Sequence, residues 1–84
     1  MFHETLPVEI YIQTIQRYLE QSISNGNKGV SFKLNDLHQE INPGVDLSPI
    51  LIRSIIDECR HNGLDITVMG SISGGVNCIV QRLR

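Results

Sequence analysis

Two cysteines and three histidines are the residues of this chain best suited to bind a metal or to act as nucleophiles. Cys59 and His61 stand two positions apart in a predicted helix, and residues two apart on a helix do not share a face. His3 and His38 belong to other segments, and no second cysteine or histidine stands at the spacing of a zinc finger. We therefore expect neither a metal site nor a bound cofactor.

The number of cysteines also bears on the compartment of the protein. A small secreted scaffold usually carries four or more cysteines, whereas this chain has only Cys59 and Cys78. Apolar residues surround both, which favours two buried thiols in a reducing cytoplasm, with a single disulfide as the alternative. The first residues lack a basic flank before an apolar stretch, so we expect no secretory signal.

Residues 70–75, Gly-Ser-Ile-Ser-Gly-Gly, form a glycine-rich stretch of the kind that can cradle a phosphate. A phosphate-binding loop is followed by Lys-Ser or Lys-Thr and by a helix, and this stretch has neither. No serine or cysteine stands in a catalytic motif with His38 or His61, and the helix dipole explains a histidine near a helix end. We therefore expect a protein that binds a partner and has no enzymatic activity.

The composition is that of one small domain, predicted to span residues 1–84. Hydrophobic residues make up 40% and charged residues 19%, which excludes the class of disordered chains. No apolar run approaches the ~18 residues of a membrane span. Seven Lys and Arg against nine Asp and Glu give a net charge of −2, which argues against binding DNA through bulk charge alone. We expect a cytoplasmic domain with no membrane partner.

Apolar residues at three- and four-residue steps predict helices over residues of about 6–24, 34–42 and 48–62. In the first helix, Tyr11, Ile15 and Leu19 share one face, and the Ser-Asn-Gly-Asn stretch at 24–27 ends it. The second helix is short, because Pro43 forbids its continuation and pushes the preceding residue out of helical geometry. Each helix thus has one apolar face that another element must cover.

The third predicted helix has the clearest start and stop signals. Ser48 is a good N-cap and Pro49 a good first helical residue, and the Asn-Gly pair at 62–63 closes the helix. Its buried face is predicted to carry Leu51, Ile52, Ile55, Ile56 and Cys59. Its exposed face is predicted to carry Ile50, Arg53, Ser54 and Asp57.

The remaining segments favour β-structure. Residues 30–32 form a short β-leaning run that predicts a brief edge strand. Residues 64–82 contain two alternating runs joined by the glycine-serine stretch, which predicts an antiparallel hairpin. Three helices cannot bury all their apolar faces between them, so the hairpin, with Leu64, Ile66 and Val68 facing inward, is expected to cover the open side.

This order of elements, from Val8 to Leu83, resembles the winged helix-turn-helix superfamily. The closest local likeness is the stretch 51–66, where an apolar helix face ends in a charged-Asn-Gly stop and runs into a strand. The connection at 42–47 is longer than the three or four residues of a tight helix-turn-helix. The resemblance implies an α+β fold of three helices, a short strand after the first helix and a two-stranded wing.

The resemblance also implies a small transcriptional regulator that reads duplex DNA with its third helix. A single domain with this charge balance would bind DNA weakly, so we expect a homodimer, which doubles the contacts. Arg53 would contact guanine, basic residues including Arg84 would contact phosphates, and the glycine-serine stretch would form the wing. The residues expected to bind DNA are Lys28, Lys33, Ser48, Ile50, Arg53, Ser54, Ser71, Ser73 and Arg82.

A protein partner is the alternative to DNA. The wing has no Lys or Arg, and phosphate would repel Asp57 on the candidate reading face. The residues expected to form a protein interaction surface are Ile10, Ile50, Asp57 and Ile72. Such a chain would be an adaptor or anti-regulator with the same fold. A contiguous basic stripe across Lys28, Lys33, Arg53 and Arg82 would favour DNA, and a neutral third helix would favour a protein.

Overall fold

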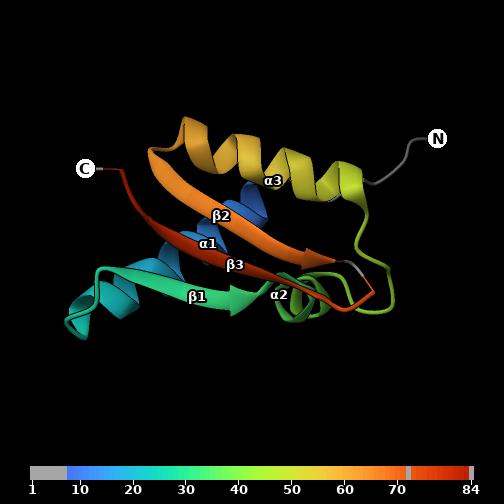
Figure 1. The fold of residues 1–84 in the computed structure, drawn as a ribbon, viewed down its shortest axis with the longest axis horizontal. Helices are drawn as coiled ribbons and strands as arrows, with labels where there is room; N and C mark the ends of the chain where they lie inside the picture. Colours follow the sequence, from blue (N-terminus) through green and yellow to red (C-terminus); the bar gives the residue numbers. More distant parts are fainter. Residues whose placement is uncertain (1–7, 72, 84) are drawn as a thin grey trace.

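The computed structural model describes residues 8–71 and 73–83, which form three helices and one sheet of three strands (Figure 1). The elements are α1 (Val8–Ser24), β1 (Gly29–Lys33), α2 (Leu34–Ile41), α3 (Pro49–His61), β2 (Leu64–Ser71) and β3 (Gly75–Arg82). The sheet is antiparallel with the strand order β1-β3-β2. The predicted α+β class, with three helices and an antiparallel sheet, is confirmed.

Helix α1 buries one continuous apolar face against the other elements. Tyr11, Ile15 and Leu19 have no exposed surface, because steps of three and four residues bring them to the same side of the helix. The hydroxyl of Ser22 donates a hydrogen bond of 2.6 Å to the Gly29 carbonyl, which joins the end of α1 to the start of β1. The first two residues of the predicted helix, 6 and 7, lie outside the described residues.

Helices α2 and α3 begin and end largely where their local signals predict. The Ser48 hydroxyl accepts a hydrogen bond of 3.2 Å from the Leu51 backbone N–H and so caps α3, and Pro49 is the first helical residue. At the other end, the Asn62 side-chain amide donates to the Glu58 carbonyl at 2.8 Å. Helix α2 begins directly after β1 without a side-chain cap.

The register of the sheet places alternate residues on an inner face toward the helices and an outer face toward solvent. Val80 pairs with Val30 of β1 and Ile66 of β2, so these three side chains form one row of the inner face. Met69 and Ile79 lie on the outer face and are about half exposed. The inner face consists of Val30, Phe32, Leu64, Ile66, Val68, Val76, Cys78 and Val80.

The hairpin spans the predicted residues 64–82, but its two strands are longer than predicted. Gly70 pairs with Val76 and Ser71 with Gly75, so strand pairing continues into the stretch that the sequence predicted to be a flexible loop. Helix α2 also supports this end of the sheet, because the Asn35 side-chain oxygen accepts a hydrogen bond of 2.7 Å from the Val76 backbone N–H. Strand pairing therefore includes both ends of the six-residue stretch that was expected to form the wing.

Candidate interaction surfaces at the N-terminal half of α3

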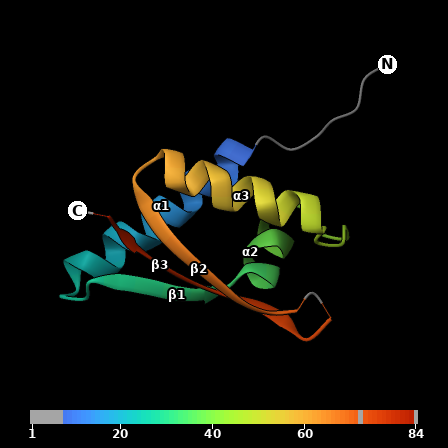
Figure 2. The same cartoon turned by 45° about the horizontal axis from the view of Figure 1, so that its top comes forward.

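The N-terminal half of α3 and the turn end of the hairpin lie at the same end of the molecule (Figures 1 and 2). Two residues separate the end of α3 from the start of strand β2, which runs back alongside the helix. Eight strand residues span about 26 Å and thirteen helical residues about 20 Å, so Ser71 returns to the end where α3 begins. Two surfaces distant in sequence thus share one side of the domain.

The exposed face of α3 is apolar at its start and balanced in charge along its length. Ile50 is 80% exposed, more than any other large hydrophobic residue in the described part of the chain. Arg53 and Asp57 are exposed one and two turns further on, and Ser54 is half-buried. The four exposed charges of the helix, two arginines and two carboxylates, come from Arg53, Asp57, Glu58 and Arg60. The face is therefore neutral, as the alternative of a protein partner required.

The basic residues expected to contact DNA lie at two ends of the sheet. Lys33 pairs with Asn77 near the turn end, and its aliphatic chain lies beside Gly75. Arg82 instead pairs with Leu64 at the far end, about 17 Å along β3 from Asn77. Lys28 precedes the strand residue that pairs with Gln81, so it lies at the far end too. The lysines and arginines do not form a contiguous stripe, and Arg84 lies outside the described residues.

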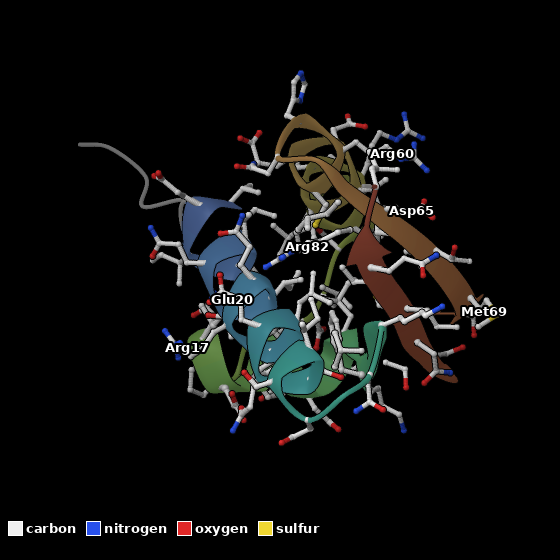
Figure 3. The ribbon with its side chains drawn as sticks, turned by 90° about the vertical axis from the view of Figure 1, so that its left-hand side faces the viewer. Arg17, Glu20, Arg60, Asp65, Met69 and Arg82 are labelled. Atoms are coloured by element: carbon white, nitrogen blue, oxygen red, sulfur yellow. The ribbon has the colours of Figure 1, made fainter. Side chains whose placement is uncertain are left out.

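The far end of the sheet contains a cleft of about 490 Å³ between α1 and the last residues of β3. Figure 3 looks at this end and shows the Arg82 side chain directed toward α1, which carries Glu20. Both residues line the cleft, together with the apolar side chains of Leu19 and Leu64. Arg82 therefore faces a different surface from the one formed by α3 and the hairpin turn.

The turn end of the hairpin carries the two serines predicted for the wing. Both Ser71 and Ser73 are exposed, and their hydroxyl oxygens lie 3.5 Å apart. The Ser71 hydroxyl also accepts a hydrogen bond of 3.1 Å from the Gly74 backbone N–H, so it stabilises the turn. Ile72, predicted for the protein interaction surface, lies outside the described residues, and Ile10 is exposed on α1.

An apolar groove of about 470 Å³ lies between the start of α1, the loop at 42–47 and the start of α3. Val45 in the loop is 46% exposed at its edge, and Ile50 projects beside it. Its walls include Val8, Tyr11, His38, Val45, Ile50 and Leu51. The sequence predicted an exposed Ile50 but not this groove, because the helix pattern says nothing about the path of an irregular loop.

A buried polar pair forms the floor of this groove. The Tyr11 hydroxyl and Nδ1 of His38 are 2.8 Å apart, and Nε2 of His38 is 2.8 Å from the Val45 carbonyl oxygen. A carbonyl only accepts, so Nε2 carries the proton and Nδ1 accepts from the tyrosine. Burial raises the pKa of Tyr11, which keeps its hydroxyl protonated as a donor. This pair joins α1, α2 and the loop through two residues that are 27 positions apart in the sequence.

The two cysteines are free and fully buried, as one of the two sequence alternatives predicted. Burial, with smaller contributions from Cys78 and Glu58, raises the pKa of Cys59 from 9.0 to about 11. Burial likewise raises the pKa of Cys78 to about 11. Thiols with such pKa values are almost entirely protonated at neutral pH and therefore react slowly.

We expect the protein to lose stability as the pH rises from 9.0 to about 11. In this range the thiols of the unfolded chain ionise while those of the folded chain stay protonated, which favours unfolding. Urea unfolding at a series of pH values measures this loss, with a Cys59→Ala/Cys78→Val variant as the control. The variant should lose less stability over the same range; an equal loss would contradict the thiol contribution.

Comparison with known proteins returned no match to a family model, a curated protein or a solved structure. Among the described residues, no group of three or more His, Cys, Asp or Glu is placed to hold a metal ion. No helix in the described ranges has the length and apolar character needed to cross a bilayer.

Proposed function

We propose that this chain is a winged-helix domain that binds duplex DNA with the N-terminal half of α3 and the turn end of the β2–β3 hairpin. The observation that carries the proposal is the return of the hairpin turn to the end of the molecule where α3 begins. In the winged-helix arrangement, a helix enters the major groove while the wing contacts the adjacent backbone. The strand order β1-β3-β2 is compatible with that arrangement.

The proposed contacts are fewer than the sequence suggested. Arg53 is exposed in the second turn of α3 and is suited to a bidentate contact with guanine. Lys33, at the turn end of the sheet, is suited to a phosphate contact. The Ser48 hydroxyl already caps α3, and the distant Lys28 and Arg82 are not part of the proposed surface. With one phosphate contact per monomer, the salt dependence of binding should be shallow, with a log–log slope of about −1.

We expect Arg53→Ala to weaken binding to a selected duplex by roughly 5- to 150-fold, the loss of one good base contact. Lys33→Ala should weaken binding to all sequences and reduce the salt slope by about 1. Fluorescence anisotropy with labelled duplexes selected from a random pool at low salt measures both effects. Arg82→Ala, at the far end of the sheet, is the matched control and should bind as the unmodified protein does. Absence of salt-dependent binding to every duplex would refute the proposal.

A protein partner at the same end of α3 is the second candidate function. Two observations favour it over DNA: the basic residues form no contiguous stripe, and the neutral α3 face carries the exposed Ile50 next to an apolar groove. The placement of the hairpin turn beside the start of α3 is what favours DNA. Affinity capture with the unmodified chain and with Ile50→Asp would test it. A partner that is lost with Ile50→Asp but retained with Met69→Asp, on the outer sheet face, supports this candidate. Identical partners for all three chains would contradict it.

A further inference from the structure

The surface around the start of α3 combines a protruding apolar side chain with an apolar groove. Ile50 is 80% exposed at the second position of the helix, and the groove beside it holds about 470 Å³. Val45 and Leu51 contribute apolar surface on either side. Removing an exposed isoleucine side chain from water is favourable, so a partner that covers Ile50 gains affinity from this one side chain.

A twofold symmetric contact between identical chains needs one patch that is complementary to itself. A protrusion directly beside a cavity meets this requirement, because rotation by 180° brings the Ile50 of each copy to the groove of the other. We propose that the Ile50 face, comprising Val8, Val45, Asp46, Ile50, Leu51 and Arg53, is a contact surface between two copies of this chain. This inference goes beyond DNA binding and does not depend on it.

The charges of the Ile50 face fit a second copy better than a strongly charged partner. Asp46 lines the groove, and Arg53 is exposed one helical turn after Ile50. Across a twofold axis, the Arg53 of each copy can face the Asp46 of the other. This gives two equivalent ion pairs between oppositely charged side chains. A strongly acidic or strongly basic partner would instead meet one like charge on this face, which disfavours it.

The proposed contact is small, and this sets its strength. Stable complexes bury about 800 Å² on each partner, and a contact limited to one helix start and one loop is expected to bury less. We therefore expect a monomer–dimer equilibrium instead of a permanent dimer. The contact would also cover Arg53 and Ser54 beside Ile50, so self-association and DNA binding through α3 would exclude each other.

Sedimentation equilibrium over protein concentrations from about 10 µM to about 1 mM tests the proposal, because weak contacts associate in that range. The unmodified chain should shift from monomer to dimer, and Ile50→Asp should raise the dissociation constant at least tenfold. Met69→Asp changes a half-exposed side chain on the outer sheet face and should leave the equilibrium unchanged. Circular dichroism of all three chains confirms that the fold is kept.

Charge exchange between Asp46 and Arg53 gives the sharper test. Asp46→Arg and Arg53→Asp should each weaken the dimer, and the double variant should restore it, because the pair is then present with exchanged signs. A chain that stays monomeric at every concentration, or a dimer that Ile50→Asp leaves intact, overturns the proposal, even where the Ile50 face captures a different protein. Lys33→Ala should reduce DNA binding without affecting the dimer, so failure of DNA binding is measured separately.

Discussion

Gly70→Ala is expected to lower the free energy of unfolding by about 3 kcal/mol or more, because two costs add at this position. The φ angle of Gly70 is +97°, a conformation that side chains with a Cβ rarely adopt. A Cβ at Gly70 would also overlap the carbonyl oxygen of Gly75 on the paired strand. The backbone of the hairpin must therefore move before alanine fits, and the last ladder pairs are lost.

Gly26→Ala is the matched control for this prediction. Gly26 has almost the same φ angle, +93°, but no atom lies within 4 Å of the position that a Cβ would occupy. Gly26→Ala should therefore lower the free energy of unfolding only through the unfavourable φ angle, by about 1–2 kcal/mol. Urea unfolding of both variants measures the difference, and equal losses would show that the overlap with Gly75 is relieved at no cost. Hydrogen exchange should show the extra loss of Gly70→Ala concentrated in the hairpin.

The second large effect is expected at the buried pair under the groove. Tyr11→Phe removes the hydroxyl that donates to Nδ1 of His38 and leaves that nitrogen buried without a partner. A buried polar group without a hydrogen bond costs about 1–3 kcal/mol, so we expect a loss of that size. His38→Leu should cost a similar amount, because it leaves the Tyr11 hydroxyl and the Val45 carbonyl without their partner.

A double-mutant cycle separates this pair from simple loss of packing. Tyr11→Phe/His38→Leu removes both members, so the double variant should lose less stability than the sum of the single variants. Tyr18→Phe is the control tyrosine, because its hydroxyl donates to Glu40 at 3.2 Å in an exposed position, and its removal should cost well under 1 kcal/mol. Additive losses in the cycle would show that the two side chains act independently.

The same pair also bears on the proposed interactions. His38 holds the Val45 carbonyl, and Val45 forms the edge of the groove beside Ile50. Gln39 holds the same loop, because its side-chain oxygen accepts a hydrogen bond of 3.3 Å from the Gly44 backbone N–H. The loop that shapes the Ile50 face is therefore fixed from α2, although it contains no regular structure. Loss of these hydrogen bonds to the loop should weaken self-association and also lower the stability of the fold.

The sequence by itself determined the helices and the fold class. The apolar face of α1 is set by steps of three and four residues, and α3 starts at Ser48-Pro49 and stops at 62–63 through groups within the helix and its immediate flanks. These signals are local, so they act in the same way whatever the rest of the chain does. The burial of both cysteines was also predictable, since each stands within an apolar pattern.

Only the tertiary structure decided which surfaces those elements form. The sequence shows that Lys33 and Arg82 are both basic, but only the strand register shows that they lie at opposite ends of the sheet. Tyr11 and His38 are 27 positions apart, and they meet because α1 and α2 pack together. The groove beside Ile50 depends on the path of an irregular loop. Periodicity records which side of an element is buried, whereas neighbours across elements are set by the path of the whole chain, which no local pattern contains.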